Sequence, residues 1–252
     1  MTRLSFALVF SLGLTAHADA SALLNFRSGA VSVLCDTRVA VSAVNCGAGF
    51  TVVGDTIGYV GAIGTWQIDT LAITSSNTPG TPTIGKINLG LVDVRHLAGP
   101  DDLTVDFGHD FFAAATGSDL VLTSTGAAAY DNAAVGDASY LTGYARTAND
   151  MGLAAPTAAT ALDVLTLTPG CFPAAGNTKS CAMVSPEVPF TKIGPFYSLA
   201  ARVEIHQHTS LTNQVSYLEK AAVQPVPEPV SLVLVGTGLL LVWTRRRSRA
   251  VN

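Results

Sequence analysis

Apolar and polar residues alternate along much of the chain, with the period of two that predicts strands half-buried in an antiparallel sheet. In 102–107, one face carries Leu103, Val105 and Phe107, and the opposite face carries Asp102, Thr104 and Asp106. In 196–208, the inward residues are Leu199, Ala201, Val203 and Ile205, and the outward ones are Ser198, Arg202, Glu204, His206 and His208.

Two further predicted strands change phase along their length. In 64–74 the apolar positions shift from Trp66 and Ile68 to Leu71 and Ile73, and 83–96 shifts near Gly90. A β-bulge, or burial on both faces, produces such a shift. Similar patterns predict strands at 30–36, 50–60, 119–124, 140–145, 162–168 and 214–223.

About ten short strands, Gly/Pro turns and no long 3.6-residue periodicity predict an all-β fold. We expect an antiparallel β-sandwich of jelly-roll-like arrangement. It should be flanked by an N-terminal signal peptide and a single C-terminal hydrophobic helix.

The N-terminus has the features of a secretory signal peptide. Arg3 precedes an apolar stretch over 4–14, and Ala16 and Ala18 form an A-x-A cleavage site. The signal peptide is therefore expected to be 1–18, with cleavage after residue 20 as an alternative. The exported domain would then be 19–224.

The C-terminal segment 225–249 has three parts in a fixed order. Pro227, Glu228 and Pro229 come first, followed by an uncharged apolar run over 230–243 and by Arg245, Arg246 and Arg247. At ~1.5 Å per residue, a helix over this run spans roughly 21 Å, which is short of the ~30 Å hydrocarbon core of a bilayer. The arginines should stay cytoplasmic. The tail is therefore better suited to a temporary membrane insertion than to a permanent anchor.

This tail closely resembles the PEP-CTERM sorting signal of Gram-negative bacteria. The resemblance implies export by the Sec machinery, a transient inner-membrane intermediate, and processing by an exosortase. Delivery to the cell surface, the outer membrane or the extracellular space would follow. The alternative is an ordinary single-span anchor. The segments 78–91, 101–112 and 195–208 also look like the ectodomains of uncharacterised PEP-CTERM proteins, which supports the fold and adds little on activity.

Charge limits the classes of partner. Without the two targeting ends, nine basic and eighteen acidic residues remain between Asp19 and Glu228, a net charge of −9. Such an acidic surface argues against nucleic acid and anionic membranes as partners.

The four cysteines predict disulfides, because an exported chain meets an oxidising compartment. Three pairings are formally possible, and we favour the two local ones, Cys35 with Cys46 and Cys171 with Cys181. Each would contribute about 2–3 kcal/mol. Zinc is disfavoured, because neither pair has C-x-x-C spacing and no histidine is near in sequence.

No recognised catalytic or phosphate-binding motif occurs, so we expect neither an enzyme nor a cofactor. His206 and His208 would leave one strand face with a spacing able to chelate a metal, but two exposed polar residues is the simpler interpretation. Calcium could bind at Asp101 and Asp102, whereas Asp106 and Asp110 would lie too far along the strand to share the ion. Three tyrosines, Tyr130, Tyr140 and Tyr144, could form a sugar-binding surface or pack over the sandwich edge.

These observations predict a sorted surface or matrix protein with a structural or adhesive role in exopolysaccharide or biofilm. The alternative function is a carbohydrate- or calcium-binding module, and a third hypothesis is a secreted hydrolase.

Overall fold

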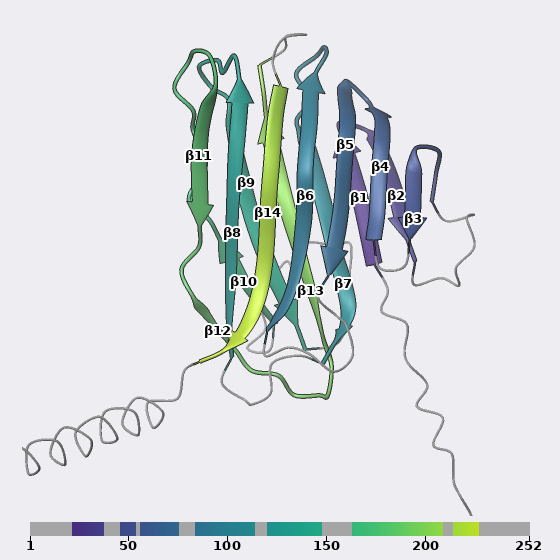
Figure 1. Ribbon diagram of the computed structural model, residues 1–252, viewed down its shortest axis with the longest axis vertical. Helices are drawn as coiled ribbons and strands as arrows, with labels where there is room; N and C mark the ends of the chain where they lie inside the picture. The colour runs from purple at the N-terminus through teal and green to yellow at the C-terminus, as the bar shows by residue number, and fades with distance from the viewer. Residues whose placement is uncertain are drawn as a thin grey trace, which may run out of the picture.

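The computed structural model describes residues 22–37, 46–53, 56–75, 84–113, 120–147, 163–208 and 214–226. These residues form two antiparallel β-sheets that face each other, and they contain no helix (Figure 1). Within them, accordingly, no helix has the length and apolar character needed to cross a bilayer. The predicted signal peptide with Ala16 and Ala18, the Pro227–Glu228–Pro229 motif, the apolar run and Arg245–Arg247 all lie outside the described residues.

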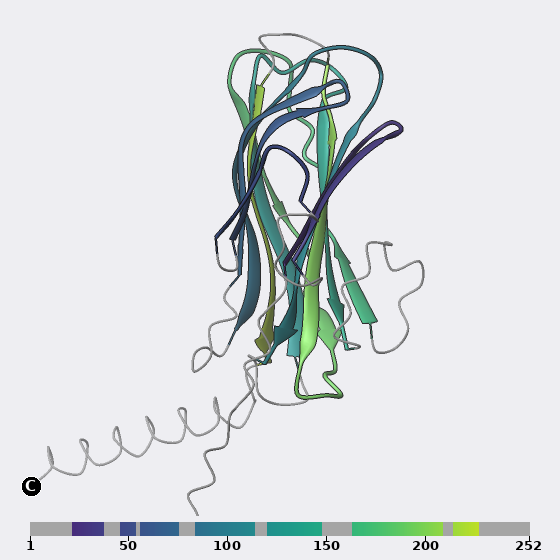
Figure 2. The same ribbon diagram turned by 90° about the vertical axis from the view of Figure 1, so that its right-hand side faces the viewer.

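The first sheet has six strands in the order β10-β9-β13-β7-β1-β2. Their bounds are β1 (Ala22–Ser28), β2 (Val31–Asp36), β7 (Leu103–Phe112), β9 (Ala138–Arg146), β10 (Asp163–Leu167) and β13 (Tyr197–His206). Figure 2 shows the two layers from the side.

The second sheet has eight strands, in the order β11-β8-β14-β6-β5-β4-β3 with β12 also paired to β8. Their bounds are β3 (Phe50–Val53), β4 (Thr56–Ile63), β5 (Trp66–Ser75), β6 (Gly85–His96), β8 (Leu120–Asp131), β11 (Lys179–Val184), β12 (Val188–Phe190) and β14 (Gln214–Pro225).

The all-β, antiparallel prediction is confirmed, and several strand boundaries are wrong. Strand β1 was not predicted, because its sequence is apolar at most positions and does not alternate. The segment 50–60, expected to be one strand, contains β3 and the start of β4, which pair as a hairpin. Strand β11 begins within the predicted turn region between Cys171 and Cys181 and ends beyond it.

Both predicted phase changes are bulges in the second sheet. The pairing of β5 with β6 shifts register between Ile68 and Ile73, and β6 shifts against β14 between Leu89 and Val92. On both strands the buried positions change parity there, from Ile68 to Leu71 and from Leu89 to Val94. An extra residue in one strand redirects the side chains that follow it, so the apolar set continues to face the core.

The core lies between the two sheets. The inward residues predicted for 102–107 and 196–208 are all buried there. Trp66 stacks on His96 with ring centroids 4.4 Å apart, and its Nε1–H donates to the Asp101 carbonyl at 2.9 Å. Asp106 and Ser198, both predicted to face solvent, are also buried. The period of two placed these residues on the correct face of the sheet, but that face is not uniformly exposed.

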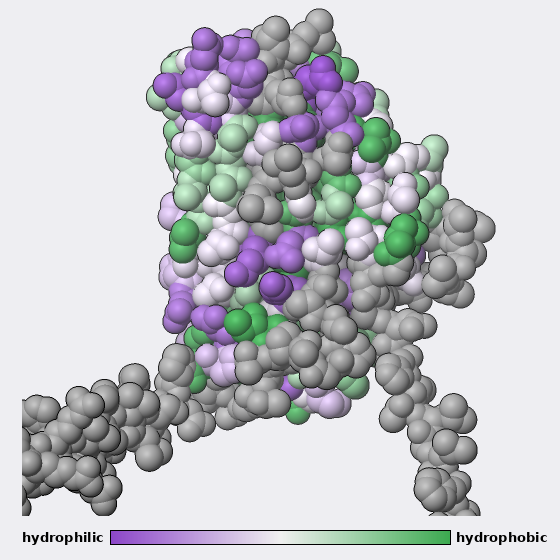
Figure 3. Space-filling model, in the orientation of Figure 1, coloured by the Kyte–Doolittle hydropathy of each residue, from purple (hydrophilic) through white to green (hydrophobic). Residues whose placement is uncertain are grey.

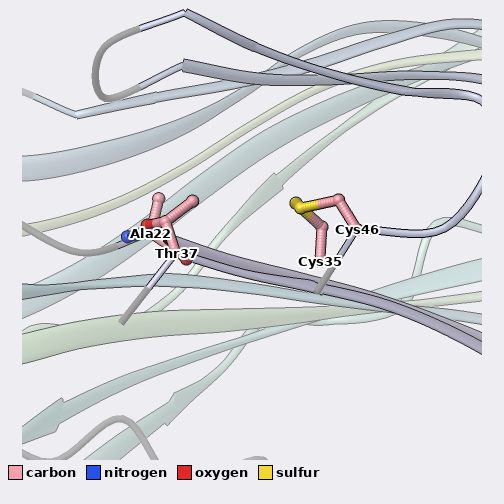
Figure 4. The surroundings of a disulfide bond; sticks show 4 residues. All are labelled: Ala22, Cys35, Thr37 and Cys46. Carbon is pink, nitrogen blue, oxygen red and sulfur yellow. Dashed lines mark hydrogen bonds between the residues drawn. A yellow bond between two sulfur atoms is a disulfide. The ribbon is translucent and has the colours of Figure 1, made fainter. Parts of the chain in front are cut away.

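A disulfide lies at each side edge of the sandwich. Cys35 of β2 bonds to Cys46, which precedes β3, and Cys171, which pairs with Ser139 of β9, bonds to Cys181 of β11. Both local pairings are thus confirmed. Beside the first disulfide, the Thr37 hydroxyl accepts a hydrogen bond from the Ala22 N–H at 2.8 Å (Figure 4).

The described chain finishes with β14 at the lower end of the sandwich in Figure 1, and β1 begins partway toward that same end. Ala22 pairs with His109 near the end of β7, and Pro225 pairs with Leu120 at the start of β8. The turn from β1 to β2 and the chain segments 97–102, 132–137 and 168–178 lie at the opposite end, here called the loop end.

Candidate functional site

The outer face of the six-stranded sheet gathers charged and aromatic side chains from distant parts of the chain. Strand register places Arg202 of β13 beside Asp106 of β7, with Thr142 of β9 and Asn25 of β1 as the next neighbours in the row. Asn25 is itself buried, and its side-chain oxygen accepts a hydrogen bond from Ser32 at 3.0 Å.

Asp106 sits between two arginines at the centre of this face. Its Oδ2 accepts from Arg27 Nη2 at 2.8 Å, and its Oδ1 accepts from Arg202 Nε at 2.6 Å. The side chains of Asp106 and Arg202 are only 12% and 15% exposed. Hydrogen bonds between full charges in such a place are strong and geometrically specific. Each oxygen of the Asp106 carboxylate is therefore bonded to one arginine.

Two pKa values reflect this buried arrangement. Burial acts to lower the pKa of Arg202, but the hydrogen bond to Asp106 and the charges of Asp106, Tyr144 and Glu204 together leave the pKa raised. Burial raises the pKa of the Tyr144 phenol; the Arg202 charge opposes this shift and the Asp106 charge reinforces it. Both groups therefore stay protonated up to a higher pH in the folded protein than they would as free side chains.

Nearer the loop end, three rings and a carboxylate form a row across the same face. The rings of Phe172 and Tyr140 meet edge to face at 5.7 Å, and those of Tyr140 and His206 at 5.6 Å. His206 Nδ1 lies 2.7 Å from Asp102 Oδ1. We call Phe172, Tyr140, His206 and Asp102 the ring row.

The chain around Phe172 is firmly held. The backbone of Cys171 exchanges two hydrogen bonds with Ser139, at 2.8 and 3.0 Å, and its side chain forms the disulfide to Cys181. A Cβ at Gly170 would lie 2.6 Å from Tyr140 and 2.7 Å from Phe172, so glycine leaves the space that both rings use. Phe172 is nevertheless 66% exposed.

The predicted metal candidates come together only in part. His206 pairs with Asp102, whereas His208 follows β13 and its backbone N–H donates to Asp137 Oδ1 at 2.5 Å. Asp106 is engaged by the arginines, and Asp110 is buried near the other end of β7. Among the described residues, no three His, Cys, Asp or Glu side chains are grouped so that they could hold a metal ion.

The tyrosine surface considered from the sequence is also only partly present. Tyr130 lies in the core, where its hydroxyl donates to Ser139 at 3.0 Å, and Tyr144 is buried beside Arg202. Tyr140 is half-buried in the ring row. Sequence reasoning missed Phe172 and Arg27. The exposure expected for the second cysteine loop was the one available signal for Phe172.

Comparison with known proteins adds no identity to these features. No protein-family model matches the chain, and no similar curated protein is found.

Proposed function

We propose that this chain is an exported protein that an exosortase processes and passes to the cell surface or extracellular matrix. There it would have a structural or adhesive role in the exopolysaccharide layer. The observation that carries the proposal is the tail, Pro227–Glu228–Pro229 followed by an uncharged apolar run and three arginines, paired with a signal peptide at the other end. Neither enzymatic activity nor a cofactor is part of the proposal.

The two disulfides support the extracellular part of the proposal. Such bonds form and persist in oxidising compartments. Here the Cys171–Cys181 bond ties β11 of one sheet to a segment paired with β9 of the other, and the Cys35–Cys46 bond ties β2 to the segment that leads into β3. A protein that must resist unfolding outside the cell benefits from such bonds, because they constrain the unfolded chain.

The direction of the chain ends supports the adhesive part. The last described residues leave β14 at the end of the sandwich away from the ring row. A domain held through this end would turn the loop end and the ring row outward. A role in binding polymer then requires no rearrangement of the domain.

The strand order supports a jelly roll, which we propose as the finer description of the fold. Strands β6-β14-β8-β11 lie side by side in one sheet, and β7-β13-β9-β10 in the other. This is the order expected for eight strands wound as two Greek keys across two sheets. Beyond these eight strands, β1 and β2 extend the six-stranded sheet, and β5, β4 and β3 extend the eight-stranded sheet at the same side of the sandwich.

Mass spectrometry of the mature C-terminus tests the sorting proposal. The protein is recovered from surface and medium fractions of the producing cells, with and without the exosortase gene. We expect cleavage close to Pro229 only when the exosortase is present. An unchanged mass and location in the deletion strain would instead indicate an ordinary single-span anchor.

A further inference from the structure

The exposed ring of Phe172 is unusual because the residue before it is held in place and the ring itself packs against Tyr140. Single exposed apolar side chains are common and need no explanation. Phe172, however, follows a buried half-cystine whose backbone makes two hydrogen bonds to Ser139, and its ring contacts Tyr140. Its conformational freedom is therefore reduced before any ligand arrives, and such preorganisation lowers the cost of binding.

The neighbours of Phe172 add directional polar groups. Asp102 is 53% exposed and offers carboxylate oxygens, His206 is bound to it, and Tyr140 has a phenolic hydroxyl. Glu204 lies on the same face, in register between Tyr140 and Thr104. The row thus presents an aromatic surface at one end and hydrogen-bond acceptors at the other.

We propose that the ring row binds a neutral sugar polymer, with a pyranose ring stacked on Phe172 and neighbouring hydroxyls bonded to Asp102 and His206. A pyranose has an apolar C–H face and a rim of hydroxyl donors, which matches a fixed aromatic ring beside carboxylate acceptors. A row of three rings and a carboxylate is longer than one ring, so more than one sugar residue would lie along it.

Charge and size argue for this ligand over others. Asp102 and Glu204 bring two carboxylates to the row, whereas Arg27, Arg202 and Asp106 together carry one net positive charge, so uronic acids and other anionic glycans would be repelled. The row consists of four side chains, whereas a stable protein–protein interface takes about 20–30 residues on each partner. This inference rests on the proposed function, because it names the class of polymer that the sorted domain would hold.

The test is binding of the full chain, purified in mild detergent, to an array of neutral oligosaccharides built from glucose, mannose, galactose and N-acetylhexosamines. Alginate, polygalacturonate and phosphatidylcholine vesicles are the comparison probes. We expect binding to at least one neutral oligosaccharide. Phe172→Ala should weaken it about tenfold, which corresponds to about 1.4 kcal/mol, since it removes the aromatic face on which the pyranose stacks. Asp102→Asn should also weaken it.

Phe196→Ala is the matched control. Phe196 is an exposed phenylalanine (38%) beside β13 that contacts Phe111, near the end where the described chain finishes. This variant should bind as the wild type does. Gly170→Ala is a second test, because its Cβ would displace the rings of Phe172 and Tyr140 without removing them. It should weaken binding while leaving the fold intact by circular dichroism.

Failure of this inference differs from failure of the sorting proposal. No binding to any neutral oligosaccharide, binding only to acidic glycans or vesicles, or equal loss in Phe172→Ala and Phe196→Ala would overturn the inference. None of these results affects exosortase-dependent cleavage, which should be the same in wild type and Phe172→Ala. Absence of that cleavage would overturn the sorting proposal and leave the measured glycan binding unchanged.

Discussion

The outer faces of the two sheets each carry an arginine–aspartate pair, and the two pairs lie in different surroundings. On the six-stranded sheet, Asp106 and Arg202 are 12% and 15% exposed. On the eight-stranded sheet, Asp69 and Arg95 are 34% and 38% exposed. The same two residue types thus form a nearly buried pair on one face and a surface pair on the other.

The difference shows that an outward-facing position need not be a solvent-exposed one. Asp106 is bonded by arginines of β1 and β13, and Asn25 beside it is buried as well. The outer face of the eight-stranded sheet instead mixes hydrophilic, pale and hydrophobic patches, as Figure 3 shows. The first face therefore has the polar network typical of a protein interior, and the second has an ordinary solvated surface.

The largest expected effect comes from removing the buried carboxylate charge. Asp106→Asn should lower the free energy of unfolding by about 3 kcal/mol, because it leaves two arginines without their counter-ion. The matched change Asp69→Asn should cost less than about 1 kcal/mol. Urea denaturation of both variants measures the difference. Added salt should reduce the Asp69 effect more than the Asp106 effect, because exposed pairs are screened more strongly.

Equal losses for Asp106→Asn and Asp69→Asn would contradict the contrast between the two faces. A double-mutant cycle with Arg202→Met sharpens the test, since a buried pair should show a clear coupling energy. The Arg95→Met cycle with Asp69→Asn provides the corresponding value for the surface pair.

The contrast also explains what the sequence could and could not predict. Alternation in 102–107 correctly placed Leu103, Val105 and Phe107 in the core and put Asp106 on the other side of the sheet. It did not predict the burial of Asp106, because the two arginines that bind it are 79 and 96 residues away in the chain. Pairing across a sheet is set by topology, which a local pattern does not contain.

The candidate site shows the same division. Exposure of the second cysteine loop and both disulfide pairings could be predicted from composition and spacing. The ring row could not, since Phe172 lies in the segment between β10 and β11, whereas Tyr140 and His206 lie in β9 and β13, and only the fold brings them together. The phase changes at Ile68–Leu71 and near Gly90 were predictable, because a bulge leaves its mark within one strand.

The two disulfides should differ in their effect on the ring row. Replacing Cys171 and Cys181 with alanine should lower the free energy of unfolding by about 2–3 kcal/mol, and so should replacing Cys35 and Cys46. Only the first change should loosen the ring row, because Cys171 precedes Phe172 and bonds to Ser139. Hydrogen exchange at the backbone amides of residues 139 and 171 measures this loosening. Equal acceleration of exchange in the two double variants would contradict the expected difference.

The smallest expected effect concerns the stability of the protein at alkaline pH. There, Tyr144 on the outer face of the six-stranded sheet should affect stability in the same way as Tyr197 in the core. Burial raises the pKa of Tyr144 above its ordinary value of 10.0, as it does for Tyr197 between the sheets. Because the folded protein holds these protons more tightly than the unfolded chain, the full stability is present below pH 10. It is lost as the pH rises toward the folded-state pKa values.

The slope should be at most about 1.4 kcal/mol per pH unit for each such tyrosine. Tyr144→Phe and Tyr197→Phe should each make the fall in unfolding free energy above pH 10 less steep, and urea denaturation at pH 9 to 11 measures it. If Tyr144 were an ordinary surface tyrosine, Tyr144→Phe would leave the slope at its wild-type value while Tyr197→Phe reduced it. That result would confine the interior-like surroundings of this face to Asp106 and its two arginines.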